Sequence, residues 1–380
     1  MIMLKLELKR LFKSPKNIGV VFCMIVFSFF ILYQLNEKRV EYDEVQLKEL
    51  YAASAIAKQE KEQLKYVEET PEVAEANEYW DFEGRYASYL RGKFNPLSDK
   101  DIFTKEERTT LEKDRYRHIL DAWDKEYNKA YLELAKTQKE LKKEIILREY
   151  LLEHKIEQYD TPYEVNTMNY LVNFFQSPNV FVFLILIAFA SIDVITKDFD
   201  CDSYKPLYTM PVARKKIIRS KVEAVLLFAL FAISVAILLP SVAAAWIGGT
   251  GILEYPQVME DFSIWIAFDY VLKCMLILLV LILFTISVIT LVSVSLRNGT
   301  SAMMAIGSYF IILYCMSELE LRFPNVLYYI PLFSVDVAYT VNVKNFSILL
   351  FSVCSLFMII LSIWASERVI ETADLSGGDA

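Results

Sequence analysis

Six long stretches of the chain contain no charged residue and are rich in apolar side chains. A helix that crosses a bilayer needs about 20 mostly apolar residues, and buried helices of water-soluble proteins rarely run so far without an amphipathic stripe. The stretches therefore predict an all-α, polytopic membrane protein with six transmembrane helices. They are Ile18–Leu35, Val165–Ile192, Ala224–Leu253, Cys274–Leu296, Asn298–Ser317 and Asn345–Ser366.

Residues 36–179 form one long hydrophilic block between the first two stretches. The block holds 23 of the 40 Lys and Arg residues and 31 of the 48 Asp and Glu residues, so it carries the whole net charge of −8. Such an acidic balance excludes a nucleic-acid binder, which would present a basic face. None of the five cysteines lies in the block, which excludes a disulfide scaffold or a cysteine-based zinc site there.

The positions of Lys and Arg beside the spans predict that both termini are cytoplasmic. Basic residues cluster before the first span and again in the loop 197–221, whereas the loop 248–263 has acids and no base. The block 36–179 is then extracellular. Residues 323–343 are apolar but interrupted by prolines, and we interpret them as interfacial or re-entrant. The alternative, a seventh span, would place the C-terminus outside.

The remaining boundaries follow from these spans. Residues 1–16 are expected to form an amphipathic interfacial helix whose cations face anionic lipid, or else an ordinary basic flank of the first span. The first transmembrane helix covers 17–35. Helices two to six lie within 180–366, and 367–380 form a cytoplasmic tail.

The extracellular block is expected to be a helical hairpin that resembles a coiled coil. Apolar residues recur at a spacing close to a heptad from Tyr116 to Tyr159, and Thr104 with Glu107 forms a capping box that starts the second helix. Between the two helices lies an aromatic segment, which we interpret either as a small core at the tip or as a surface for an amphipathic ligand or partner. Its aromatic residues are Tyr79, Trp80, Phe82, Tyr86 and Tyr89.

Motifs for catalysis and nucleotide binding are absent from the sequence. Without G-x-x-x-x-G-K-[ST] the chain cannot cradle nucleotide phosphates in the usual way, so any ATP-driven work needs a partner. H-E-x-x-H and G-x-S-x-G are also missing. His118 and His154 stand 36 residues apart on the expected second helix and are interpreted as surface or seam residues. We therefore predict no catalytic residue, cofactor or metal on this chain.

Charged residues lie at the ends of the spans and not at their centres. Glu223 and Asp193 are expected to pair with bases of the neighbouring basic loop, and Glu223 specifically with Arg219 or Lys221. A proton-coupled carrier usually needs a charge within a span. The apolar spans instead suit a conduit for a hydrophobic or amphipathic substance.

The loop between spans two and three has the form of a docking element. A turn with Leu207 and Met210 precedes Pro211 and a basic amphipathic helix. This loop resembles that of the permease subunits of type-2 ABC exporters, in which an acid and a Leu-containing helix precede Pro-x-x-Arg and a downstream Lys. Pro211-Val-Ala-Arg214 and Lys221 match, whereas Asp202-Ser203 replaces the Gly-Thr of the family. The resemblance covers both ends and the last half of the chain and leaves 36–179 uncovered.

The resemblance implies a permease subunit of an ABC exporter in a bacterial plasma membrane. It implies a dimer of like or unlike permease chains in contact with membrane lipids, and two copies of a separate ATPase that binds ATP and magnesium. The substrate would be a hydrophobic or amphipathic peptide, lipid or drug. The residues implied to couple to the ATPase are Leu207, Met210, Pro211, Arg214, Lys215, Lys216 and Lys221.

Other classes of function stay open at this point. One alternative is a membrane sensor or immunity protein whose extracellular helices bind a ligand. A second is a mechanotransmission protein, in which ATP cycling drives the outer domain to act on a partner. A membrane-embedded enzyme lacks any catalytic constellation.

Overall fold

The computed structural model describes residues 2–94, 104–125, 136–176, 178–200, 213–319, 324–343 and 346–372. Contacts between residues divide the chain into two compact units. Unit 1 consists of Met1–Leu32, Asn166–Gly251 and Asp269–Ala380, and unit 2 consists of Tyr33–Val165 and Ile252–Phe268. Each unit is assembled from segments that are far apart in the sequence.

Six of the described helices are long and apolar enough to cross a membrane, which confirms the all-α polytopic fold. Between α12 and α14 the described residues form only the short helices η2 (Asn325–Tyr329) and α13 (Val337–Asn342), neither of which can span a bilayer. The six helices are α2 (Pro15–Leu64), α8 (Asn179–Asp200), α10 (Arg214–Gly248), α11 (Ala267–Leu296), α12 (Gly299–Glu318) and α14 (Ile348–Thr372).

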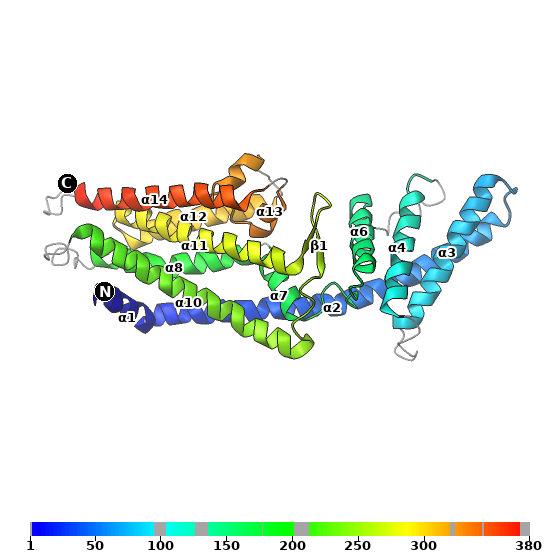
Figure 1. The fold of residues 1–380 in the computed structure, drawn as a ribbon, viewed down its shortest axis with the longest axis horizontal. Coiled ribbons are helices and arrows are strands. Elements are labelled where there is room, and N and C mark those ends of the chain that lie inside the picture. Colours follow the sequence, from blue (N-terminus) through cyan, green and yellow to red (C-terminus); the bar gives the residue numbers. More distant parts are fainter. Residues whose placement is uncertain are drawn as a thin grey trace. The chain divides into compact units, whose positions relative to one another are not determined.

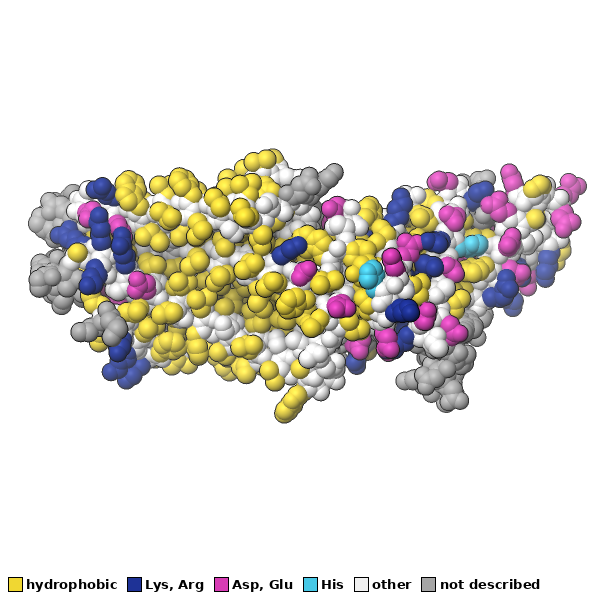
Figure 2. Space-filling model, viewed as in Figure 1, with side chains coloured by type: hydrophobic (Ala, Val, Ile, Leu, Met, Phe, Trp, Pro, Cys, Tyr) yellow, Lys and Arg dark blue, Asp and Glu magenta, His cyan; other side chains and the backbone are white. Residues whose placement is uncertain are grey.

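Helix α1 and the C-terminal turns of α14 lie at the same end of unit 1 (Figure 1). Helix α10 packs against α1 (Ile2–Lys13), α8 and α14, and α12 packs against α8. Hydrophobic side chains cover much of the visible face of unit 1, and Lys and Arg side chains gather at the end where the termini lie (Figure 2). An even number of spans requires this arrangement of the termini.

The first helix forms as predicted but packs against protein as well as facing outward. Leu11 is buried, and the ring of Phe12 makes edge-on contacts with Phe228 and Phe231 of α10, at centroid distances of 5.4 and 5.2 Å. Ser14 separates α1 from α2, where Pro15 occupies the first helical position that proline tolerates best. Part of the apolar face of α1 is therefore part of the core of unit 1.

The short helix α7 (Thr167–Phe174) belongs to unit 1, although its residues fall within the predicted extracellular block 36–179. Its first backbone amides, from Thr167 and Met168, donate to the carbonyls of Gly249 and Thr250 at the end of α10. These bonds satisfy donors that a helix N-terminus leaves free. The polar start of the second apolar stretch is thus a separate helix that packs against α10.

Unit 2 differs from the predicted hairpin of two long helices. The first long helix is present, because α2 runs without a break to Leu64, and α3 (Pro71–Phe94) follows it. The expected second helix is instead two helices, α4 (Lys105–Asp121) and α6 (Gln138–Glu153), which pack against each other. His118 and His154 consequently lie on different helices.

Capping residues explain where α4 and α6 begin. Thr104 and Glu107 form the predicted capping box of α4, and Thr137 and Glu140 form a second one that starts α6. The sequence signal for the second start is Thr137-x-x-Glu140, which has the form of a capping box. Apolar residues at heptad-like spacing on either side of this start therefore belong to two helices.

A β-hairpin from the loop between spans three and four completes unit 2. Strands β1 (Pro256–Val258) and β2 (Ile264–Ile266) pair antiparallel, with Gln257 opposite Trp265. The hairpin packs against α6, where Lys139 and Lys143 both pair with Glu260. This loop and the hydrophilic block therefore share one folded unit, as expected if both lie on the same side of the membrane.

Candidate functional site

The predicted coupling segment continues directly into the third span. Leu207, Met210 and Pro211 lie outside the described residues. Arg214, Lys215, Lys216 and Lys221 lie on the first turns of α10, which extends unbroken to Gly248. Ala213 is the N-cap and supplies no side-chain hydrogen bond. The described part of the basic segment, Arg214–Lys221, is thus the first part of a spanning helix.

Lys221 is buried in a cluster of charges from three helices. Its ammonium group lies 2.5 Å from Oδ2 of Asp198 on α8 and 3.4 Å from Oε1 of Glu7 on α1, and it donates to the carbonyl oxygen of Val194 at 2.6 Å. Arg10 of α1 donates to the other oxygen of Asp198 at 3.3 Å. A charged group tolerates such burial only when it is paired and hydrogen-bonded, so the cluster holds α1, α8 and α10 together.

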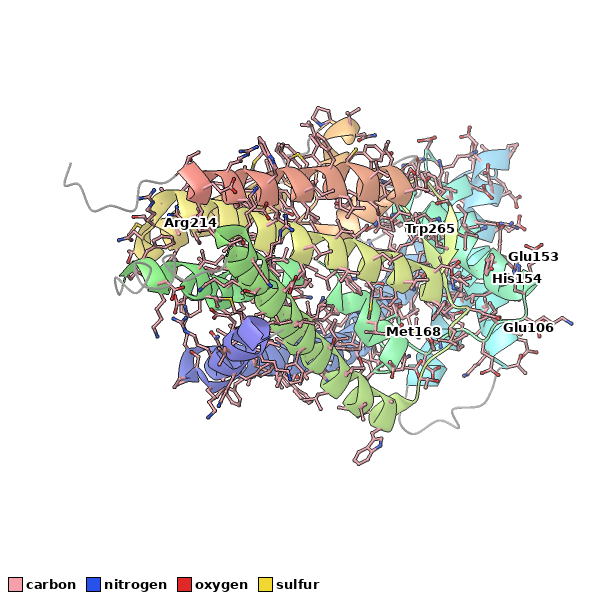
Figure 3. All side chains as sticks on the ribbon, turned by 60° about the vertical axis from the view of Figure 1, so that its left-hand side comes forward. Glu106, Glu153, His154, Met168, Arg214 and Trp265 are labelled. Atoms are coloured by element: carbon pink, nitrogen blue, oxygen red, sulfur yellow. The ribbon has the colours of Figure 1, made fainter. Side chains whose placement is uncertain are left out.

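Three other bases of α10 contact the C-terminal turns of α14. Arg214, labelled in Figure 3, donates to the carbonyl oxygen of Ile370 at 3.2 Å. The ammonium group of Lys215 lies 3.1 Å from the carboxylate of Glu371. Arg219 forms a bidentate ion pair with Glu367, with N···O distances of 2.6 and 3.2 Å. Cations also interact favourably with the exposed carbonyls at a helix C-terminus. The last residues of α14 therefore form a fixed part of this end of unit 1.

Lys216 differs from its neighbours. Its side chain is exposed, and within the described ranges it makes no ion pair. Of the four described coupling candidates, it is the one whose charge is open to another protein. The predicted coupling residues thus divide into Lys216, which faces outward, and Arg214, Lys215 and Lys221, which hold this chain together.

Two further contacts connect α8 with its neighbours. Asp193 pairs with Lys16 at the start of α2, at 2.8 Å. Asp200 accepts a hydrogen bond from the backbone amide of Gly299 at 3.4 Å, at the N-terminus of α12 where an acid is favourable. A β-carbon at Gly299 would lie 3.0 Å from Asp200 and Thr196, so glycine permits this close approach.

We name this group of residues the charged end of unit 1. Its apolar base contains Ile195, Ile217, Ile218, Val294 and Ile370, all of them buried. Glu223 was expected to pair with Arg219 or Lys221. In the structure Arg219 forms its ion pair with Glu367, and Lys221 pairs with Asp198 and Glu7. The charged end consists of Glu7, Arg10, Lys16, Asp193, Asp198, Asp200, Arg214, Lys215, Arg219, Lys221, Glu367 and Glu371.

The aromatic segment of unit 2 lies mainly in the interior. Tyr79, Trp80 and Tyr86 are buried in one hydrophobic cluster, Phe82 is half-buried, and the side chain of Tyr89 lies outside the described set. His118 stacks on Tyr79 with ring centroids 4.7 Å apart. These rings fill the space between α3 and α4 and, as described, offer little exposed area to a ligand.

A buried network of charges lies beside this aromatic cluster. Glu112 of α4 accepts hydrogen bonds from Arg108 at 2.8 Å, from Arg148 of α6 at 2.7 Å and from Gln158 at 2.8 Å. Burial would raise the pKa of Glu112, but the two guanidinium groups outweigh it and hold that pKa well below its usual range. The network joins α4 to α6 and is structural in character.

No arrangement for metal binding occurs in the parts of the chain that the structure describes. Within these ranges no group of three or more His, Cys, Asp or Glu side chains could hold a metal ion. His154 stacks on Tyr150 at the end of α6 and points its Nδ1 to the carbonyl oxygen of that residue (Figure 3). The two histidines thus contact aromatic rings of their own unit.

Six spanning helices, with a charged end that ties both α1 and α14 to α10, define a multi-pass membrane protein. A family model described as ABC-2 family transporter protein matches residues 1–331. The match covers most of the chain, which therefore belongs to the ABC-2 transporter family and is a membrane-spanning permease of an ABC transporter. The matched range includes residues 36–179, which the motif resemblance had left uncovered. No curated protein and no solved structure matches the chain.

Proposed function

We propose that this permease exports a hydrophobic or amphipathic substrate, such as a peptide, a lipid or a drug, and is powered by a separate ATPase. Two copies of the ATPase would bind ATP and magnesium and dock on residues 203–221 of two paired permease chains. Both termini would be cytoplasmic, in a bacterial plasma membrane. Membership of the ABC-2 family supports the ATPase partner and the pairing of permeases.

The observation that carries this proposal is the continuity of α10. Because Arg214 and the third span belong to one helix, a force applied at Lys216 would act directly on the span. The buried pair between Lys221 and Asp198 and the pair between Arg219 and Glu367 would pass that force to α8 and α14. ATP-driven closure of the ATPase could thus move several spans together.

The polar residues of α11 support a substrate that needs no charged path. Thr290 and Ser287 are buried and donate to the carbonyls of Ile286 and Phe284 of their own helix. These hydroxyls are satisfied by their own backbone, as is common for Ser and Thr in apolar helices. The spans also lack central charges, which suits a hydrophobic or amphipathic cargo.

The docking surface can be tested by purifying the tagged chain with its partner in mild detergent. We expect an ABC ATPase to accompany the wild type and to be reduced at least tenfold with Lys216→Glu, while thermal unfolding of the permease stays unchanged. Lys48→Glu, an exposed lysine in unit 2, is the matched control and should retain the ATPase. Arg214→Glu should lower both ATPase recovery and stability, because Arg214 also binds α14.

Other results would argue against the proposal. Full recovery of the ATPase with Lys216→Glu would mean that the docking surface lies elsewhere. Absence of any ATPase from the wild type would remove the basis for ATP-driven export. Substrate specificity can then be followed in vesicles that contain the permease and its ATPase, with flux compared in the presence and absence of ATP.

A groove in unit 2 favours a second candidate, in which the extracellular unit binds a ligand or partner and the chain acts as a sensor or a mechanical transmitter. The groove encloses about 880 Å³ between α2 and α3, and Lys58, Lys61, Lys65 and Arg85 line it with only Glu62 and Asp81 as acids. This reading predicts that Lys58→Glu/Lys65→Glu abolishes the response to a ligand without changing flux. Loss of flux itself would favour a role in export.

A further inference from the structure

A second cavity lies at the junction of α1 and α2, on the side of α8. It encloses about 430 Å³, which is within the range of sites that hold small ligands. Its wall carries Lys9, Arg10 and Lys13 from α1 and Lys197 from α8, together with the acids Glu7 and Asp193. Four basic groups thus converge on a cavity in which only two acids could balance them.

The two acids of the wall are already paired, with Lys16 and Lys221 from outside the cavity and with Arg10 of the wall itself. Asp193 pairs with Lys16 at 2.8 Å. Glu7 lies 3.4 Å from Lys221 and 3.8 Å from Arg10, and Arg10 also contacts Asp198 at 3.3 Å. The carboxylates of the cavity wall are therefore already neutralised by ion pairs within the charged end of unit 1.

The three lysines of the wall have no such partner. The side chains of Lys9, Lys13 and Lys197 are exposed, and none of them forms an ion pair within the described ranges. Lys9 and Lys13 stand four residues apart on one face of α1, where two like charges repel each other. An anion bound in the cavity would relieve this repulsion and bring Lys197 of α8 to the same ligand.

Apolar side chains beside the cavity indicate which kind of anion it takes. Leu6 of α1, which lines the cavity, is 61% exposed, and Ile18, just beyond it on α2, is 57% exposed. Ile18 lies at the start of the spanning helix α2 and Leu6 on the adjoining helix α1. A lipid at this place has its headgroup beside the lysines and its acyl chains beside the apolar residues. A small soluble anion would gain nothing from these apolar groups.

We infer that this cavity binds the phosphate of an anionic phospholipid headgroup, held by Lys9, Lys13 and Lys197. The lipid would fasten the α1–α2 junction to α8 from the membrane side. Juxtamembrane lysines are attracted to anionic lipid surfaces, and the cavity would make this attraction specific to one place. The inference does not depend on the export function, because it concerns binding alone.

The test measures lipid binding by the purified full chain with native mass spectrometry. Phosphatidylglycerol and phosphatidylcholine are titrated separately against the wild type and against Lys9→Gln/Lys13→Gln/Lys197→Gln. We expect phosphatidylglycerol to bind more tightly than phosphatidylcholine to the wild type. Each lysine removed should weaken phosphatidylglycerol binding by roughly fivefold, while phosphatidylcholine binding is unchanged.

Two further variants separate this site from general electrostatics and from misfolding. Lys48→Gln/Lys142→Gln/Lys155→Gln removes the same charge from exposed positions of unit 2, outside the groove between α2 and α3, and should retain full phosphatidylglycerol binding. Lys9→Arg/Lys13→Arg/Lys197→Arg keeps the charge and should retain it as well. If the cavity variant and the unit 2 variant lost phosphatidylglycerol affinity to the same extent, the inference would be overturned. It would also be overturned if the wild type bound phosphatidylglycerol and phosphatidylcholine equally well. Displacement of the lipid by millimolar inorganic phosphate would overturn the assignment to a lipid.

Discussion

The ammonium nitrogen of Lys221 lies 2.5 Å from Oδ2 of Asp198, and this buried pair joins the start of the third span to the end of the second. The side chain of Lys221 is only 3% exposed. A lysine that the sequence offers as a contact for an ATPase is therefore enclosed by its own chain. The same helix start that exposes Lys216 is anchored to its own chain through Lys221.

Removal of Lys221 should destabilise the permease. Breaking one partner of a buried ion pair costs about 3 kcal/mol or more, because the remaining charge stays buried. We expect Lys221→Met to lower the free energy of unfolding by about 3 kcal/mol in a denaturing-detergent titration. Lys216→Met, at an exposed position five residues earlier on α10, is the control. Equal stability of the two variants would show that the pair contributes nothing.

The pair between Arg219 and Glu367 should couple α10 to α14 more weakly. Glu367 is buried, but the side chain of Arg219 is 62% exposed, so water screens the interaction. A double-mutant cycle with Arg219→Ala and Glu367→Ala should give a coupling energy of about 1 kcal/mol. The exchanged variant Arg219→Glu/Glu367→Arg should recover part of the stability that either single reversal loses. Strictly additive losses would contradict a direct pair.

The buried Glu112 should make unit 2 sensitive to acid. Because the folded-state pKa of Glu112 lies below the ordinary value of 4.5, the folded chain holds fewer protons than the unfolded chain below that pH. Its stabilising contribution is complete above about pH 4.5 and is lost as the pH falls through the lower, folded-state pKa. The loss should approach about 1.4 kcal/mol for each pH unit between these two pKa values.

Variants of α4 can isolate this effect. Glu112→Gln should be less stable than the wild type at pH 6, and the difference in unfolding midpoint should narrow as the pH is lowered towards 3. Glu106→Gln, at an exposed position of the same helix, is the matched control and should stay close to the wild type in its unfolding midpoint. If the difference in unfolding midpoint between the wild type and Glu112→Gln stayed constant with pH, the carboxylate of Glu112 would not be specifically stabilised in the folded state.

Trp80 distinguishes a core from a binding surface. Its side chain is fully buried in the cluster with Tyr79 and Tyr86. Truncation of a buried aromatic residue costs about 3–5 kcal/mol, so Trp80→Ala should markedly lower the unfolding midpoint of the full chain. Tyr66→Ala, at a position that is 91% exposed, should leave it unchanged. A stable Trp80→Ala variant that loses a ligand would instead favour the surface interpretation.

The membrane-spanning helices were readily predicted from the sequence, because the need to satisfy backbone hydrogen bonds in lipid makes a long apolar stretch a helix in almost any context. Helix boundaries in the hydrophilic block were harder. Heptad-like spacing from Tyr116 to Tyr159 indicated one helix, but the structure has α4 and α6, with a new start at the capping residue Thr137. Spacing reports which faces are apolar and does not report where a helix ends.

The partners of charged side chains were the least predictable feature. Closeness in the sequence suggested that Glu223 pairs with Arg219 or Lys221. The structure instead gives Arg219 a partner on α14 and Lys221 partners on α8 and α1. Ion pairs of this kind depend on distances of a few ångströms between helices that lie far apart along the chain. Local sequence carries no information about those distances.

The amino-acid sequence alone therefore determined the membrane class, the six spans, the first helix and the position of the basic segment. These follow from hydrophobicity and charge, which act on each segment by itself. Only the tertiary structure decided that α10 begins within the basic segment, that Lys221 is enclosed while Lys216 is exposed, and that residues 252–268 fold with the distant hydrophilic block. The reason is physical: burial and pairing are properties of the packed helices, and each depends on residues that no single segment contains.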